Sequence, residues 1–236
     1  MLPKSQAHTL REKDMAFTRK ALIDSVTPDQ LIIQALYSAD ELAKALNALA
    51  GRVRGWYCLA HPELEHDVED NEAFLKALLD DHKKSQMGAT LAEHDLKEVR
   101  ALAKDCLQLF ARLNSLQQYI EQMMAKHLPN ATIIAGATIG ARLLAQAGSL
   151  KSLAMMPANT IQLLGAEKAL FRHMRNKRAL PPKYGILHEH PLIQKSRVKG
   201  KTARMIADKL AIAAKVDYFK GEPIGAKLLK EIEARS

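Results

Sequence analysis

The sequence predicts an all-α protein in which a long coiled-coil helical hairpin precedes a globular helical domain. Three observations support this prediction. Aromatic residues are only 5% of the 236 residues while Ala and Leu are abundant, a composition typical of helices and not of β-sandwiches or barrels. A sustained heptad pattern occupies the middle of the chain. From residue 130 onward, small residues and frequent helix breaks replace it.

The N-terminal half contains two helix-start signals before the heptad region. Residues 1–27 are polar without a clean period, and we interpret them as an N-terminal arm or a ragged first helix. Thr27-Pro28-Asp29-Gln30 is a capping signal, and Ser38-Ala39-Asp40-Glu41 repeats it. The second signal predicts a separate helix over about 39–59, ended by His61-Pro62. One short helix is expected around residues 72–79.

The clearest predicted element is a helix that runs from the capping residue Thr90 to just before Pro129. Its apolar residues recur at alternating spacings of three and four, which makes a heptad seam of roughly 50 Å at 1.5 Å per residue. We expect the 39–59 helix to fold back on part of the seam, and the remainder to pair with a second copy of the chain or with a relative. The predicted coiled-coil domain covers residues 28–129, and its seam comprises Val99, Leu102, Cys106, Leu109, Leu113, Leu116, Ile120 and Met123.

Residues 130–236 are predicted to form the globular domain. Residues 131–147 read as one helix in which Gly136 and Gly140 let another backbone approach closely. Gly148 is the expected C-cap and Ser149 the cap of the next turn. Short helices follow, then one over 166–176, an irregular stretch over 181–200, and amphipathic helices over 202–218 and 224–234.

Charge is divided unevenly between the two halves. Residues 1–134 carry 16 basic and 19 acidic residues, whereas residues 135–236 carry 19 basic and 7 acidic ones. Eleven of the basic residues fall between residues 168 and 204, where Glu189 is the single acid. This density favours binding of RNA or DNA over an ordinary solvated surface.

The basic residues of this stretch form two groups. Lys168, Arg172 and Arg175 recur at helical spacing and share one face of the 166–176 helix, while Ala169, Leu170 and Met174 are expected to face the core. The second group follows the Pro181-Pro182 pair and comprises Lys183, Lys195, Arg197, Lys199, Lys201 and Arg204. Lys and Arg side chains beside a helix start suit phosphate oxygens.

Other chemistries are poorly supported. His173, His188 and His190 could suggest a metal site, but no third ligand has a fixed spacing and the surrounding charge is positive. The stretch between Gly136 and Gly140 lacks the Gly-Lys-Ser/Thr of a P-loop, and no catalytic constellation stands out. We therefore expect no cofactor, no metal and no enzymatic activity.

The chain is predicted to be intracellular. Two cysteines, Cys58 and Cys106, exclude a disulfide-dense scaffold. No apolar run approaches the ~18 to 20 residues of a membrane span, and the first residues lack the apolar core of a secretory signal.

Several long segments resemble a known family. Residues 147–172 (AGSLKSLAMMPANTIQLLGAEKALFR) are similar to the signature of the Nop domain, as are residues 182–191 (PKYGILHEHP) and 201–219 (KTARMIADKLAIAAKVDYF). Residues 56–64 (WYCLAHPEL) resemble the segment before the coiled-coil arm of the same family. The resemblance covers roughly residues 28–236 and is strongest to the archaeal core proteins of box C/D small ribonucleoproteins.

The resemblance implies a non-catalytic ribonucleoprotein scaffold. A Nop domain, here residues 130–236, binds a kink-turn RNA together with a kink-turn-binding protein of the ribosomal type, and the coiled coil dimerises. Full-length members also hold the fibrillarin methyltransferase through an N-terminal domain, and a guide RNA directs 2′-O-methylation. An archaeal cytoplasmic location follows from the same resemblance.

The family also implies site residues by position. The RNA-binding residues are expected to be Lys168, Arg172, Arg175, Lys183, Gln194, Arg197, Lys199, Lys201 and Arg204. The partner protein is expected to meet Gly165, Ala166, Glu167, His188 and His190.

One departure from the family pattern concerns the N-terminus. Members usually have about a hundred more residues before the coiled coil, so the fibrillarin-docking domain is expected to be missing and recruitment of fibrillarin is in doubt. The rival hypothesis is a dimerisation module whose basic surface meets an acidic protein and no RNA. A third, an enzyme, would need a catalytic constellation that the sequence does not offer.

Overall fold

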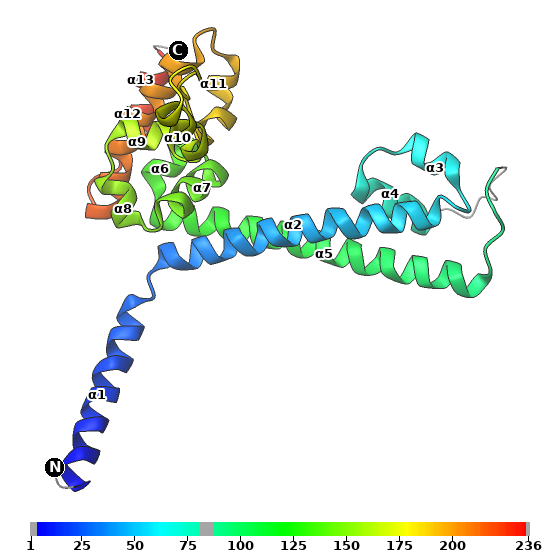
Figure 1. The fold of residues 1–236 in the computed structure, drawn as a ribbon, viewed down its shortest axis with the longest axis horizontal. Helices are drawn as coiled ribbons and strands as arrows, with labels where there is room; N and C mark the ends of the chain where they lie inside the picture. Colours follow the sequence, from blue (N-terminus) through cyan, green and yellow to red (C-terminus); the bar gives the residue numbers. More distant parts are fainter. Residues whose placement is uncertain (1–3, 81–86, 235–236) are drawn as a thin grey trace. The chain divides into compact units, whose positions relative to one another are not determined.

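The computed structural model describes residues 4–80 and 87–234, and within these ranges it contains helices and no strand (Figure 1). The predicted all-α class is confirmed. None of the described helices is both long and apolar enough to cross a lipid bilayer. The helices are α1 (Lys4–Ser25), α2 (Pro28–Tyr57), α3 (Pro62–Asp67), α4 (Asn71–Asp80), α5 (Glu93–His127), α6 (Pro129–Ala135), α7 (Ala137–Ala147), α8 (Leu150–Met155), α9 (Ala158–Leu163), α10 (Glu167–Arg175), the 3₁₀ turn η1 (Ile186–Glu189), α11 (Pro191–Lys195), α12 (Lys199–Phe219) and α13 (Gly225–Glu233).

The chain divides into two compact units. One comprises Ala35–Ile120, and the other comprises Met1–Gln34 together with Glu121–Ser236. The three-part division predicted from the sequence, with boundaries after residues 27 and 129, remains a prediction.

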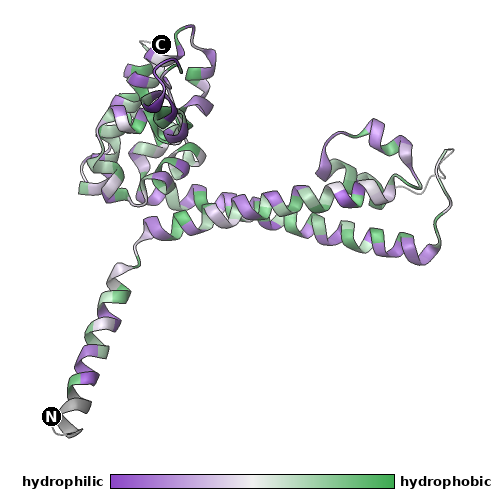
Figure 2. Cartoon of the chain, in the orientation of Figure 1, coloured by the Kyte–Doolittle hydropathy of each residue, from purple (hydrophilic) through white to green (hydrophobic). Residues whose placement is uncertain are grey.

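The unit over Ala35–Ile120 is an amphipathic helix pair covered by a short helical insertion. Figure 2 shows apolar and polar residues interleaved along α2 and α5, the pattern expected of helices that each bury one stripe. The buried stripes meet α4 in one core. Its members are Leu46, Ala50, Val53, Tyr57, Phe74, Leu75, Leu78, Val99, Ala103 and Cys106.

The insertion contains an additional helix, α3, that the sequence reading did not anticipate. Arg54 of α2 holds its end, because Nη1 donates to the Val68 carbonyl at 2.7 Å and Nη2 to the Glu69 carbonyl at 2.9 Å. The same guanidinium lies 4.4 Å from the ring centroid of Phe74. A single buried arginine stem thus fixes the turn between α3 and α4.

The second helix start predicted at Ser38 is wrong. Helix α2 runs without a break from Pro28 to Tyr57. A capping residue can start a new helix only where the backbone has first left the α-helical conformation. No Gly or Pro near Ser38 causes such a break. Ala39 is buried, so core packing keeps the chain helical through the apparent signal.

The predicted seam residues all lie on the shielded side of α5. Val99, Cys106 and Ile120 are buried, and Leu102, Leu109, Leu113 and Leu116 are partly buried. At the C-terminal end Met123 is only partly buried, while Met124 is completely buried. A straight helix of 3.6 residues per turn drifts away from a strict seven-residue repeat, so the buried position shifts by one residue.

The predicted 131–147 helix is two helices, α6 and α7, separated at Gly136. Gly136 has φ of +77°, a conformation that favours glycine and interrupts the helix. Gly140 faces the Met124 side chain and not another backbone, since a Cβ there would lie 2.7 Å from Met124 Cε. The predicted C-cap at Gly148 is confirmed, as is the cap at Ser149, whose hydroxyl accepts from the Ser152 amide at 3.1 Å.

Helix α12 forms the centre of the globular part, packing against α6, α8, α9, α11 and α13. Its buried face is largely alanine, which permits close helix approach, and it comprises Thr202, Ala203, Ile206, Ala207, Leu210, Ala211, Ala213, Ala214 and Asp217.

Asp217 joins three helices through a buried hydrogen-bond network. Its carboxylate accepts from the Asn130 amide at 3.1 Å, from Asn130 Nδ2 at 2.7 Å and from the Ala131 amide at 2.9 Å. Asn130 Oδ1 in turn accepts from the amides of Ile224 and Gly225 at 2.8 and 2.7 Å. The charged side chain therefore caps the N-terminus of α6 while Asn130 caps that of α13.

We expect Asp217→Ala to lower the free energy of unfolding by about 2 to 4 kcal/mol, because it leaves buried amide donors of α6 without an acceptor. Denaturant titration followed by circular dichroism measures the change. The control is Asp105→Ala on the exposed side of α5, for which the expected change is within about 0.5 kcal/mol. A loss at Asp217 no larger than at Asp105 would contradict the role given to the network.

Candidate nucleic-acid interface

The first predicted basic group lies on α10. Lys168, Arg172 and Arg175 are all exposed, and no residue of this helix is buried. Its segment is predominantly hydrophilic in Figure 2. Met174 was expected to face the core but is 59% exposed, because α10 rests on its neighbours only through half-buried residues such as Ala169 and Leu170.

The turn before α10 is held by Glu167. Gly165 has φ of +83°, and the Gly165 amide donates to Glu167 Oε1 at 2.8 Å. Gln146 Nε2 of α7 donates to the same oxygen at 3.1 Å. The Glu167 carboxylate therefore shapes the turn and orients α10, while Gly165 and Ala166 form its surface.

The segment that precedes η1 lies along the end of α9. The amides of Gly185 and Ile186 donate to the carbonyls of Gln162 and Leu164 at 2.9 and 2.8 Å. Gln162 Nε2 returns a bond to the Lys183 carbonyl at 2.6 Å. Gly185 is required here, because a Cβ at this position would lie 1.8 Å from the Leu164 carbonyl oxygen.

The two histidines after this segment have different environments. His188 is exposed, and its ring stacks on Tyr184 with centroids 5.4 Å apart. His190 is only 6% exposed: Nε2 lies 2.8 Å from the Ile134 carbonyl, and Nδ1 accepts from the Leu192 amide at 3.2 Å. Contact with a partner, as predicted for His190, needs an accessible ring, and the structure gives this ring a capping role at α11 instead.

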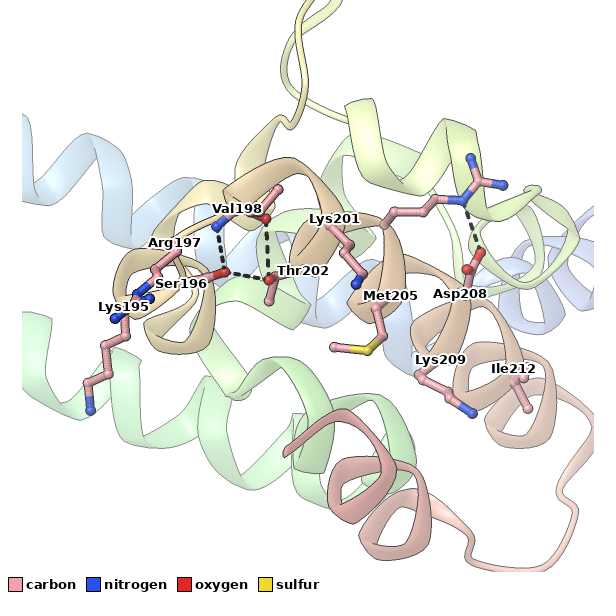
Figure 3. A pocket seen from close by; sticks show the side chains of 11 residues that line it. Lys195, Ser196, Arg197, Val198, Lys201, Thr202, Met205, Asp208, Lys209 and Ile212 are labelled. Atoms are coloured by element: carbon pink, nitrogen blue, oxygen red, sulfur yellow. Dashed lines mark hydrogen bonds and ion pairs between the residues drawn. The ribbon is translucent and has the colours of Figure 1, made fainter. Parts of the chain in front are cut away.

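The second predicted basic group gathers around a cavity at the start of α12 (Figure 3). The cavity has a volume of about 1050 Å³, and Arg197, Lys201 and Arg204 line it. Lys195 and Lys209 line it as well. Lys209 was missed by the sequence reading, although its four-residue spacing from Met205 and eight-residue spacing from Lys201 place all three on one helical face.

Lys183 and Lys199 of this group, and the predicted RNA contact Gln194, lie near the cavity without lining it. Lys183 is exposed, and its aliphatic part lies over Gly200, where a Cβ would be 3.5 Å from Lys183 Cδ. Lys199 is half-buried at the first position of α12. Gln194 is exposed and its Nε2 donates to the His188 carbonyl at 2.9 Å.

Carboxylate partners are scarce on this surface. Arg204 Nε lies 3.3 Å from Asp208 Oδ1, and Lys209 pairs with Glu231. Within the described parts of the chain, no ion pair involves Lys168, Arg172, Arg175, Lys183, Lys195, Arg197, Lys199 or Lys201. Unpaired cations on a rigid frame can bind several phosphate groups at once.

His173, His188 and His190, which suggested a metal site, do not gather in the structure. Across residues 4–80 and 87–234, no three His, Cys, Asp or Glu side chains gather closely enough to hold an ion. His173 is instead engaged locally, with Nδ1 2.5 Å from the Ala179 carbonyl.

Comparison with protein families identifies one match. The Nop family, described as a snoRNA binding domain with fibrillarin, matches residues 38–85 and 77–236. These two segments together span most of the chain.

Individual relatives are similar over most of this chain. An uncharacterized NOP5 family protein of Methanocaldococcus jannaschii is 40% identical over 234 residues, covering 88% of this chain and 56% of that protein. Nucleolar protein 58 of Schizosaccharomyces pombe is 37% identical over 216 residues, covering 80% and 42%, and nucleolar protein 56 of the same yeast is 34% identical over 242 residues, covering 88% and 48%. The chain thus spans about half the length of these curated relatives.

The fold is similar to that of a solved structure. A chain in the crystal structure of a fibrillarin/Nop5p complex superposes with a TM-score of 0.53 at 28% sequence identity. The superposition covers 99% of this chain and 79% of that chain.

The close backbone contact at Gly185 generates a prediction. Gly185→Ala forces a Cβ into the Leu164 carbonyl, and we expect it to lower the free energy of unfolding by about 1 to 3 kcal/mol. Gly200→Ala is the matched control, because it lies in α12 where only the Lys183 side chain is near, and alanine favours helix. Thermal unfolding measures both, and equal melting temperatures for the two variants would contradict the assigned contact.

Proposed function

Because this chain belongs to the Nop family, we propose that it is a non-catalytic RNA-binding scaffold of a box C/D-like ribonucleoprotein, reading a kink-turn RNA together with a kink-turn-binding protein. The observation that carries the proposal is the set of unpaired cations on α10 and around the cavity beside α12. Duplex RNA is recognised mainly through shape and backbone phosphates, which is the chemistry that exposed Lys and Arg side chains provide.

The rigidity of the supporting elements favours shape recognition. Glu167 fixes the turn before α10, and the Gly185 contact ties the following segment to α9. Because the backbone that carries the cations is held in place, little of it has to be ordered on binding, and a bent RNA that matches the spacing of the cations is preferred over a straight one.

The proposed contact with the kink-turn-binding protein involves a smaller set than the sequence predicts. Gly165, Ala166 and His188 lie at the surface and are available to a partner. His190 is assigned to positioning, because both of its ring nitrogens already bond within the chain, and Glu167 positions the turn through Oε1. These surface residues adjoin α10 with Lys168, Arg172 and Arg175, so the chain can contact one protein partner and one RNA at the same time.

Assembly through the arm is supported by apolar side chains that the helix pair leaves at the surface. Tyr37, Leu49 and Trp56 of α2 and Tyr119 of α5 are between 37% and 50% exposed. Large apolar residues exposed along a helical pair suit another helical surface. We propose that the arm pairs with a second copy of the chain or with a relative.

Removing single cations tests the RNA surface. We expect Lys168→Ala to weaken binding to a box C/D kink-turn RNA that is already bound by its kink-turn-binding protein, and to reduce the slope of log affinity against log salt by about one unit. Arg204→Ala is expected to change the slope less, because Asp208 already competes for that guanidinium. Gel-shift titrations at several salt concentrations measure both effects.

Controls separate the rival function from the proposed one. Lys227→Ala, an exposed cation on α13, should leave affinity and slope unchanged if binding is confined to the assigned surface. Absence of binding to the free and the pre-bound RNA would contradict the proposal. Capture of an acidic protein with the same variant sensitivity would then support the dimerisation module.

A further inference from the structure

We infer that the cavity beside the start of α12 holds one unpaired nucleotide, with its phosphate at the loop end and its base against α12. The inference rests on the proposed function in taking RNA as the ligand, and goes beyond it by assigning contact with a base. It depends on the charge distribution in the cavity, its apolar floor and the fixed loop that bounds it.

The two ends of the cavity differ in net charge. At the loop end, Lys195, Arg197 and Lys201 carry no ion pair within the parts of the chain that the structure describes. Toward the C-terminal side of the same face, Asp208 pairs with Arg204 and Glu231 pairs with Lys209. A phosphate is therefore attracted to the loop end, whereas the opposite end is compensated and attracts a second anion less strongly.

Apolar side chains lie next to the loop end. Val198 is 61% exposed beside the cationic loop, and Met205 follows Lys201 by four residues and lies near the centre of the view in Figure 3. Ile212 also lines the cavity, but it is roughly 16 Å further along α12 than Lys201, at 1.5 Å per residue, and lies beyond the compensated end. A surface that meets only the phosphates of a duplex has no need of an apolar floor. The flat face of an unstacked base covers such side chains and removes them from water.

The loop that bounds the cavity is fixed before any ligand arrives. The hydroxyls of Ser196 and Thr202 lie 2.7 Å apart, and the Val198 amide donates to Ser196 Oγ at 3.2 Å. These bonds, drawn in Figure 3, hold Lys195 and Arg197 beside the first turn of α12. The volume of about 1050 Å³ is at the upper end of the roughly 300 to 1000 Å³ typical of small-ligand sites, so a nucleotide fits with its neighbours emerging from the opening.

The combination favours a nucleotide over an acidic peptide. A peptide would place its carboxylates at intervals along the groove, and those beyond the loop end would meet Arg204 and Lys209, whose charges are already paired with Asp208 and Glu231. A nucleotide carries one charged group and one flat, uncharged group on the same sugar. This matches a cationic loop end with apolar side chains next to it.

The test compares RNA with and without bases on the full chain. Fluorescence anisotropy measures binding of a labelled six-residue adenosine RNA and of an abasic ribose-phosphate of equal length and charge. We expect the base-containing RNA to bind about tenfold more tightly, since contacts to base faces are worth roughly that much per base or more. Equal affinity for the two ligands would overturn the inference.

Matched variants locate the effect in the cavity. Met205→Gln should weaken adenosine RNA binding about fivefold and leave abasic binding unchanged, because it replaces an apolar contact with a polar group of similar length. Ile133→Ser on α6 is the control, since Ile133 is 43% exposed but lies outside the cavity. Ile212→Ser is a second control, since Ile212 lies beyond the reach of a base whose phosphate is at the loop end, and Lys201→Ala should weaken both ligands.

Remaining outcomes are equally decisive. Equal effects of Met205→Gln and Ile133→Ser would overturn the inference, as would tight binding of a hexaglutamate peptide that is sensitive to Met205→Gln. A kink-turn RNA is titrated in parallel with the same protein. Loss of kink-turn binding with retained discrimination between adenosine and abasic RNA would reject the proposed function alone, and the reverse result would reject the nucleotide site alone.

Discussion

The buried carboxylate of Asp217 is the interaction on which the arrangement of the globular part depends. It lies near the C-terminal end of α12 and bonds to the first residues of α6, while Asn130 passes the connection on to the start of α13. Residues about 90 positions apart in sequence are thereby joined at one point. Since helix termini otherwise leave several amides without partners, this single charge both satisfies a buried end and sets the position of α12. The cavity and its cations lie at the other end of that helix.

Other polar side chains position surface elements in the same way, through hydrogen bonds within the chain. Glu167 orients α10 through its bonds to Gly165 and Gln146, and His190 links the start of α11 to the Ile134 carbonyl. In each case a side chain whose type suggests contact with a ligand bonds within the chain. The cations differ, because most of them are exposed and form no ion pair within residues 4–80 and 87–234. Polar side chains that bond within the chain hold the elements in position, whereas the exposed cations form the proposed binding surface.

Much of the fold follows from patterns that are local in sequence. The heptad spacing of α5, the glycine after α7 and the serine before α8 each specify a backbone conformation with little help from distant residues. Prediction failed at Ser38 because packing that buries Ala39 keeps α2 continuous. It failed at Gly136 for a local reason, since a positive φ at this glycine divides the helix. The shift from Met123 to Met124 reflects helix geometry that a strict heptad ignores.

The candidate site was predictable to the extent that charge alone defines it. Clustering of Lys and Arg indicated Arg197, Lys201 and Arg204 correctly as neighbours, because they follow one another closely in sequence. Burial of His190 could not be foreseen, since its partner carbonyl lies 56 residues earlier in the chain. The position of Val198 and Met205 at the cavity was also hidden, because apolar residues on an amphipathic helix are expected to face the core.

The absence of any buried residue in α10 has a consequence for how this surface changes over evolutionary time. A nine-residue helix is marginal by itself, and here its side chains contribute little packing to the domain. Substitutions on its outer face therefore leave the folded state nearly as stable as before. Under the proposed function, the ligand preference of α10 can change in single steps without loss of the fold, whereas the residues beneath the surface remain constrained by stability.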